Sequence, residues 1–397
     1  MMSRLPGLGP WLALLLALMS CLVAADCECG FAQDFPADEA GGGDGNMNTD
    51  GRLLFTNMME SKFFELRNIS QDGNWKRQQY NVSARAGRGE YGKTFGVQNV
   101  YTLAADGHSE NVDADAGPGE GIALVVGSTL VDEAIPTAEL ASARKDMFFG
   151  SYRAGMKLTP VNGTCAAFFW YFNDTQEIDM EFLSREFDAS KKLYPVNLVI
   201  QSEASREAGY DASKTGTYKV VNLTFDPTEG FHEYRFDYLH NQVLFYADSQ
   251  LLAEMNGTSV PSGPGHIILQ HWSNGNSKWS GGPPKQDAVM TVSYVKAYFN
   301  SSDAHVQSSF AESCQKARDD DADSDGNGRV CWIPDVTASN ATTGGTFFNT
   351  SDPNQPKSNG SGGGGGTEDG DSSAVHLSST PTLAAVLLSM LVLLAYS

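Results

Sequence analysis

The feature that most constrains this chain is the run FFWYFNDTQEIDMEFL at residues 168–183. In its second half, acidic and apolar residues alternate with a period of two, which predicts a β-strand with two chemically different faces. One face carries Glu177, Asp179 and Glu181, and the other carries Ile178, Met180 and Phe182. Because carboxylates on one face repel one another, we interpret the acidic face as an active site rather than a structural feature.

The alternative is a helix that exposes Glu177 and Glu181 to solvent. Like charges four residues apart would slightly destabilise such a helix, and the three apolar residues would not share one stripe. The spacing therefore favours the strand.

The rest of the chain predicts an all-β fold made of two packed antiparallel sheets. Short apolar or alternating segments recur between Gly, Asn, Asp and Pro turns, and helices are not needed. We expect strands at residues 75–84, 121–127, 147–158, 164–172, 176–183, 196–201, 217–223, 231–238, 242–246, 266–270 and 289–299.

Both ends of the sequence have the pattern of processing signals. Residues 1–25 combine an apolar run with small residues before Asp26, which predicts a signal peptide and secretion. Residues 373–397 end in an apolar run with no Lys or Arg after Lys357, and small residues precede a polar spacer. This pattern predicts a GPI lipid anchor, with a membrane helix at the tail as the alternative.

The net charge and the glycosylation motifs limit the class of partner. A formal charge of −21 excludes nucleic acid, which needs clustered Lys and Arg, and favours a neutral polymer or a small ligand. Ten Asn-x-Ser/Thr motifs agree with secretion. A glycan on Asn173 would crowd the acidic face, so either Asn173 is unmodified or the strand begins after it.

The cysteines agree with an extracellular protein but leave the disulfide pairing open. Cys21 leaves with the signal peptide, and an odd number of five cysteines remains. Cys27 and Cys29 are too close to pair easily, so we expect them to reach different partners. A local loop closed by Cys314 and Cys331 is one option.

Composition divides the mature chain into an N-terminal extension (26–52), a main domain (53–302), an acidic appendix (303–336) and a disordered linker (337–372). Asp321, Asp323 and Asp325 resemble the first half of a calcium loop, but Trp332 replaces the closing Glu. A solvated loop is therefore favoured over a metal site. We expect no cofactor and a monomer.

The acidic face fits the hydrolysis of a glycosidic bond with retention. That reaction needs a nucleophilic carboxylate and a protonated carboxyl at roughly 5–5.5 Å from each other. Long Glu side chains at positions i and i+4 of a concave strand can lean together to this separation. Asp179, between them, is placed to orient a neighbouring Glu and to raise the affinity of one partner for its proton.

The segment Glu177-Ile-Asp-Met-Glu181 resembles the signature of glycoside hydrolase family 16 without a β-bulge. Segments 149–158, 231–236, 243–248 and 292–298 resemble further family strands in the same order. The resemblance implies a β-jelly-roll sandwich with a concave sugar-binding cleft. It also implies Glu177 as the nucleophile, Asp179 as its assistant and Glu181 as the acid and base. Cys27-Glu-Cys29-Gly30 resembles secreted or wall-anchored fungal members, which implies β-glucan substrates.

Sugar subsites need flat apolar surfaces with polar groups around them. We expect Trp272 and Trp279 to stack on sugar, since both lie in a polar loop. Trp170 fits a subsite or the core equally well. The weaker candidates for sugar contact are His271, Asn274, Tyr91 and Arg153.

The sequence thus predicts a retaining endo-β-glucan hydrolase of the cell surface or wall. A transglycosylase shares the first half-reaction and stays open as the alternative. A non-catalytic lectin or a structural wall protein with a vestigial site is disfavoured, because neither needs the intact set of three acids.

Overall fold

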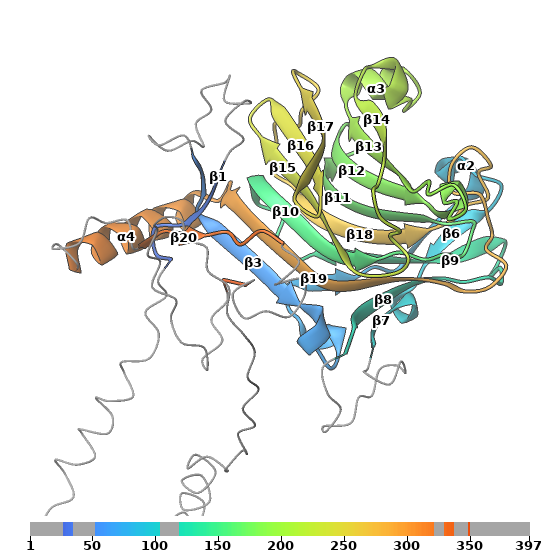
Figure 1. The fold of residues 1–397 in the computed structure, drawn as a ribbon, viewed down its shortest axis with the longest axis horizontal. Helices are drawn as coiled ribbons and strands as arrows, with labels where there is room; N and C mark the ends of the chain where they lie inside the picture. The colour runs from blue at the N-terminus through green and yellow to red at the C-terminus, as the bar shows by residue number, and fades with distance from the viewer. Residues whose placement is uncertain (1–26, 35–51, 104–118, 321–328, 337–347, 350–397) are drawn as a thin grey trace, which may run out of the picture. The chain divides into compact units, whose positions relative to one another are not determined.

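The computed structural model describes residues 27–34, 52–103, 119–320, 329–336 and 348–349 of the 397-residue chain. Two large sheets stack against each other in this part of the chain, as Figure 1 shows. Neighbouring strands pair antiparallel within both, with one parallel exception between β6 and β9. The predicted sandwich of two antiparallel sheets is therefore confirmed.

The first sheet, called the cleft sheet below, has nine strands. Their order is β14 (Tyr218–Asn222), β13 (Pro195–Gln201), β12 (Gln176–Leu183), β11 (Cys165–Asn173), β18 (His266–Trp272), β9 (Ala134–Ser142), β6 (Gly92–Phe95) and β5 (Tyr80–Val82), with β4 (Trp75–Arg77) beside β9.

The second sheet, called the outer sheet, has eight strands. Their order is β17 (Gln250–Asn256), β16 (Gln242–Ala247), β15 (His232–Leu239), β10 (Met147–Lys157), β19 (Ala288–Ser301), β8 (Gly121–Val126) and β7 (Val100–Leu103), with β3 (Asn57–Lys62) beside β19.

The core lies between these two sheets. Ile178, Met180 and Phe182 of β12 are buried there, so the predicted apolar face of the acidic strand is confirmed. From the outer sheet, Phe236 and Tyr152 pack into the same cluster. Since side chains alternate along a strand, burial of this face places the three acids on the opposite side of the cleft sheet.

A third, small sheet joins the two ends of the described chain. It consists of β2 (Arg52–Phe55), β1 (Phe31–Asp34) and β20 (Cys331–Trp332), in that order. Disulfides link Cys27 to Cys331 and Cys29 to Cys314. The option of a local bond between Cys314 and Cys331 is wrong, because β1 pairs directly with β20 and brings Cys27 to Cys331.

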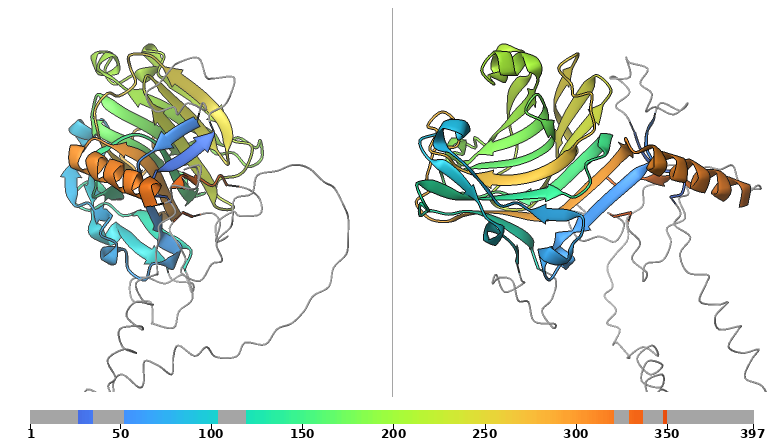
Figure 2. Two further views of the ribbon diagram at one scale, coloured as in Figure 1. Left: turned by 90° about the vertical axis from the view of Figure 1, so that its left-hand side faces the viewer. Right: turned by 180° about the vertical axis from the view of Figure 1, so that it is seen from behind.

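The described residues of the two sheets contain no long helix, as expected, but one helix forms in the acidic appendix (303–336), where none was predicted. Helix α4 (Ala304–Asp320) follows β19, as Figure 2 shows from two sides. The Cys29–Cys314 disulfide holds it to the N-terminal segment. Its sequence holds three Ala, two Gln and one each of Glu, Lys and Arg, which favour helix. Short helical turns occur at α2 (Ala84–Gly87), α3 (Glu203–Glu207), η1 (Phe63–Glu65), η2 (Ile69–Gln71), η3 (Val97–Asn99), η4 (Ser184–Glu186) and η5 (Ala212–Lys214).

A cluster of buried charges lies where residues 333–336 cross the outer sheet. Arg153 and Arg235 donate hydrogen bonds to Asp335 Oδ1 at 2.8 and 3.1 Å, and Lys296 donates to the Pro334 carbonyl at 2.9 Å. Arg153 is fully buried in this cluster. The prediction of Arg153 as a cleft residue is therefore wrong, because its strand β10 belongs to the outer sheet.

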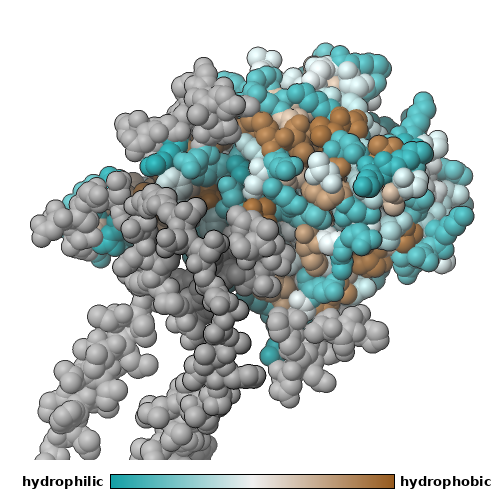
Figure 3. Space-filling view, viewed as in Figure 1, coloured by the Kyte–Doolittle hydropathy of each residue, from teal (hydrophilic) through white to brown (hydrophobic). Residues whose placement is uncertain are grey.

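The surface seen in Figure 3 mixes hydrophilic side chains with smaller apolar patches. Val220 of β14 and Leu251 of β17 are among the large apolar residues that are exposed. No helix among the described residues is long and apolar enough to cross a membrane.

Candidate active site

The run at residues 168–183 forms a hairpin rather than one strand. Strand β11 ends at Asn173 and β12 begins at Gln176. In the turn between them, the Thr175 amide and hydroxyl both donate to Asn173 Oδ1 at 2.9 Å. Of the two options stated for Asn173, the structure has the strand beginning after it.

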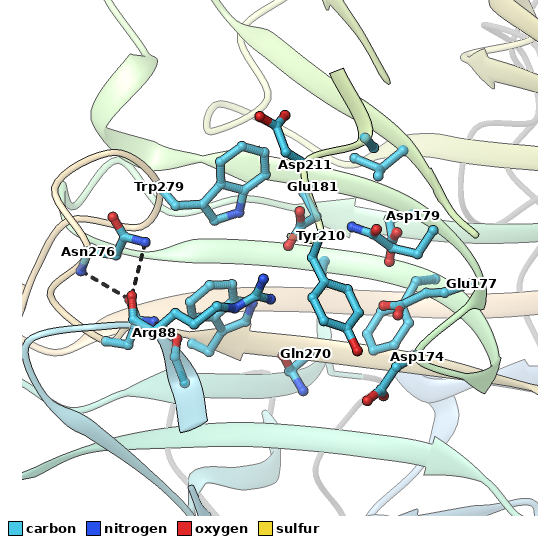
Figure 4. A pocket seen from close by; sticks show the side chains of 18 of the residues that line it. Arg88, Asp174, Glu177, Asp179, Glu181, Tyr210, Asp211, Gln270, Asn276 and Trp279 are labelled. Atoms are coloured by element: carbon cyan, nitrogen blue, oxygen red, sulfur yellow. Dashed lines mark hydrogen bonds between the residues drawn. The ribbon is translucent and has the colours of Figure 1, made fainter. Parts of the chain in front are cut away.

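The hairpin register sets the places of the three acids. Ala167 of β11 lies opposite Glu181, and Phe169 lies opposite Asp179. Ala167 and Phe169 therefore lie on the same face of the cleft sheet as the three acids. Glu177, Asp179 and Glu181 all line one cavity of about 810 Å³ over that face, and Figure 4 shows their side chains together in it.

Burial raises the proton affinity of all three carboxyls. It raises the pKa of Glu177 to about 7, although a hydrogen bond with Asp179 opposes this rise. Burial, followed by the negative charge of Glu177, raises the pKa of Asp179 well above its usual range. A neutral Asp179 therefore donates a proton to its hydrogen bond with an ionised Glu177.

Burial also raises the pKa of Glu181, while its hydrogen-bond donors oppose the shift. The Cys165 thiol donates to Glu181 Oε1 at 3.3 Å, and the Trp279 indole N–H is a second donor to this carboxyl. The positive charges of Lys93 and Arg88 also oppose this rise in the pKa of Glu181. The three acids thus occupy three different environments, which is the condition for giving them different roles.

Two of the predicted aromatic residues lie in the cleft. Trp272 and Trp279 both line it and are partly exposed. The Lys93 ammonium lies 4.4 Å from the centre of the Trp272 ring, a cation–π contact. Trp279 reaches the cleft from the loop after β18, with Tyr218 of β14 beside it at 6.3 Å between ring centres.

Trp170 and His271 do not lie in the cleft. Of the two places that Trp170 fits, the structure has the core, and the prediction of His271 as a sugar-binding residue is wrong. Trp170 is fully buried in the core, and its indole N–H donates to the Met147 carbonyl at 3.3 Å. His271 is fully buried between the sheets, where Leu124 O and Thr164 Oγ1 lie 2.8 and 3.0 Å from its ring nitrogens. Burial lowers the pKa of His271 to about 4, so it is neutral.

Asn274 borders the cleft, but its side chain forms hydrogen bonds within the surrounding loops. Its side chain is nearly fully buried and donates to the Gly87 carbonyl at 2.7 Å, which ties α2 to the loop of Trp279. A Cβ on Gly89 would lie 2.2 Å from the Asn274 carbonyl oxygen, so this close approach requires glycine. Tyr91 packs against a small apolar cluster and is not among the residues around the cavity.

Several cleft residues escaped the sequence reasoning. They share no motif and come from loops or from strands whose alternation is weak: Arg88, Lys93, Asp174, Tyr210, Tyr218, Gln270, Asn276 and Lys278. Only Gln270 had a usable signal, because it stands two residues before Trp272 and therefore shares its face.

The described residues contain no group of three His, Cys, Asp or Glu side chains placed to hold a metal ion. Asp321, Asp323 and Asp325 lie outside the described residues.

Comparison with known proteins agrees with this geometry. Residues 105–296 match the family Glycosyl hydrolases family 16. A beta-glucanase of Bacillus licheniformis is 31% identical over 158 residues, which are 37% of this chain and 58% of that protein. A beta-glucanase of Paenibacillus polymyxa is 30% identical over 139 residues, 34% of this chain and 52% of that protein. The match thus spans a little over half the length of these relatives.

Among solved structures, the Bacillus licheniformis beta-glucanase is one of those similar to this chain. It superposes with a TM-score of 0.45 at 21% identity, over 61% of this chain and 97% of that one. The family match and the two relatives agree with each other: residues 105–296 are similar to glycosyl hydrolases family 16.

Proposed function

We propose that this chain is a retaining, endo-acting β-glucan hydrolase. The observation that carries the proposal is the set of three carboxyls on one strand face, where burial and different hydrogen-bond partners give each acid its own proton affinity. A retaining glycosidase needs one carboxylate and one carboxylic acid on the two sides of the scissile bond. The similarity to beta-glucanases supports the substrate class.

In this mechanism Glu177 is the nucleophile. Its carboxylate attacks the anomeric carbon, and the bond to the leaving oxygen breaks as Glu181 gives that oxygen its proton. Water then enters, Glu181 takes back a proton, and the bond to Glu177 breaks to restore the original anomeric configuration. Asp179 stays neutral and orients Glu177 through their hydrogen bond.

The aromatic residues Trp272 and Trp279 supply the surfaces on which pyranose rings stack. Trp279 has a second effect, because its hydrogen bond to Glu181 couples sugar binding to the position of the acid. Polar cleft side chains such as Gln270 and Asn276 can form hydrogen bonds with the sugar hydroxyls.

The proposal also places the enzyme outside the cell, held by a lipid anchor at the membrane or in the wall. The two disulfides support secretion, because such bonds persist in oxidising compartments. The ten glycosylation motifs and the resemblance of the Cys27 region to fungal wall proteins point the same way.

The test compares Glu177→Gln and Glu181→Gln with wild type on a panel of β-1,3-, β-1,4- and mixed-linkage glucans. Loss of turnover in both, with no loss in the matched control Glu229→Gln, is expected. Glu229 is exposed and outside the cleft. Wild-type turnover in either cleft variant would overturn the assignment. If neither wild type nor any variant is active while binding persists, the chain is a lectin.

Two further measurements distinguish the nucleophile from the acid and base, and hydrolysis from transglycosylation. With azide, Glu177→Ala should form a glycosyl azide of inverted configuration, while Glu181→Ala should form one of retained configuration. Sizing the products of a defined oligosaccharide separates hydrolysis, which gives only shorter chains, from the alternative of transglycosylation, which also gives longer ones.

A further inference from the structure

One thiol lies against the proposed acid and base. Cys165 is the first residue of β11 and points to the same face of the cleft sheet as Ala167 and Phe169. Its Sγ lies 3.3 Å from Glu181 Oε1, within the usual limit for a sulfur hydrogen bond. In the strand register Cys165 pairs with Trp272 of β18, so it lies between the proposed acid and a proposed stacking residue.

This thiol is neither a disulfide partner nor exposed. Among the described cysteines it alone is free, and it is fully buried. The other acceptor near its sulfur, the carbonyl of Ala166, is more distant at 3.8 Å. Burial raises the thiol pKa well above its usual range, so Cys165 keeps its S–H and acts as a donor to Glu181.

We propose that Cys165 is a positioning residue that holds Glu181 in place by donating a hydrogen bond to its Oε1. The inference rests on the role of Glu181 proposed above. An S–H group is a weak donor. It therefore fixes the direction of the carboxyl while stabilising the charged form less than a hydroxyl in the same place would. That balance suits a group that must hold a proton in one half-reaction and accept one in the next.

Other groups also face this carboxyl and must be counted. From β6 comes the Lys93 ammonium, and from the end of α2 comes Arg88. From β12 itself come Glu177 and Asp179, and from β14 comes the Tyr218 hydroxyl. The Trp279 indole N–H is the second hydrogen-bond donor. All six groups are unchanged when only Cys165 is replaced, so the change in the pKa of Glu181 reports on the thiol.

The first test uses two near-isosteric variants with opposite predictions. Cys165→Ser replaces the thiol by a stronger donor and should move the alkaline limb of kcat/KM to lower pH, by about half a unit to one unit. Cys165→Ala removes the donor and should move it to higher pH by about half a unit. A packing role alone would lower activity in both variants and leave the limb in place, and that result would overturn the proposal.

The second test does not depend on activity. Cys165 is the free thiol of the described chain, so the infrared S–H stretching band that disappears in Cys165→Ser belongs to it. This band should shift as Glu181 titrates, and Glu181→Gln should abolish the pH dependence. The control Glu177→Gln should keep it. A band that ignores both pH and Glu181→Gln would refute the hydrogen bond, whereas a responsive band in an inactive enzyme would refute only the proposed reaction.

Discussion

The Arg88 guanidinium lies 4.8 Å from the centre of the Tyr210 ring, and this contact joins two loops that come from opposite ends of the cleft sheet. Arg88 ends α2 and precedes β6, whereas Tyr210 follows α3 after β13. Both side chains line the cavity of the three acids, as Figure 4 shows. Both backbones are left-handed, with φ of 56° and 62°. The pair is therefore a bridge between the two loops at this cavity, where the proposed substrate would bind.

Breaking this bridge should ease the binding of long chains. A cation–π contact is worth about 0.5–2 kcal/mol. Tyr210→Ala should therefore tighten the binding of a soluble β-glucan by about two- to thirtyfold, measured by calorimetry in a Glu177→Gln background that prevents turnover. Tyr210→Phe keeps the ring and is the matched control, with wild-type affinity expected. Weaker binding in Tyr210→Ala would show instead that the ring contacts the sugar.

The pH dependence should have its acidic limb near pH 7. The nucleophile acts as a carboxylate, and burial raises the pKa of Glu177 to about 7. The value of kcat/KM should therefore fall about tenfold for each pH unit below that point. Asp179→Ala removes a donor to the charged form and should move this limb to higher pH, whereas Asp179→Asn keeps a donor and should leave it closer to the wild-type position. An acidic limb near pH 4 would contradict the assignment of this limb to a Glu177 carboxyl of raised pKa.

The ionised Glu177 carboxylate should lower the free energy of unfolding above about pH 7. The folded-state pKa of Glu177 lies above its unfolded value of 4.5, so its effect on stability is absent below about pH 4 and grows as pH rises to about 7. Glu177→Gln should thus raise the free energy of unfolding by about 3 kcal/mol at pH 8 and hardly change it at pH 4. Denaturant unfolding at the two pH values measures this difference. An equal effect at both would mean that packing, rather than charge, is responsible.

The sequence was informative where side chains alternate and one face is buried. Burial of Met180 and its neighbours could be read from the period of two in β12, and so could the shared face of the acids. The predicted strand at residues 266–270 ends two residues before the end of β18. Trp272 on the cleft face requires His271 to face the core, and the wrong prediction for His271 came from placing these two residues in a loop.

Other features depend on contacts that no local pattern contains. Strand β9 has the sequence AIPTAELAS, whose small residues alternate too weakly to predict a strand. The two disulfides join residues 304 and 285 positions apart, and pairing over such distances follows from the fold rather than from spacing. The Arg88–Tyr210 bridge likewise needs both loops in place before either residue has a role.

Removing the Asp335 carboxylate should weaken the packing of residues 333–336 against the outer sheet. Arg153 and Arg235 both donate to Asp335 Oδ1, and both guanidinium groups are buried. Asp335 itself is half-exposed and the arginines keep other partners, which reduces the loss. Asp335→Ala should therefore lower the free energy of unfolding by about 1–2 kcal/mol.

Asp34→Ala is the matched control, because the Asp34 side chain is 83% exposed and lies 3.7 Å from Arg52. An exposed pair of this kind contributes about 0–1 kcal/mol, so little change is expected. Denaturant unfolding of both variants measures the difference, with the disulfides intact. Equal small effects would show that water replaces the Asp335 carboxylate at the two arginines, whereas a large effect confined to Asp335→Ala would show that the buried charges need this partner from the C-terminal segment.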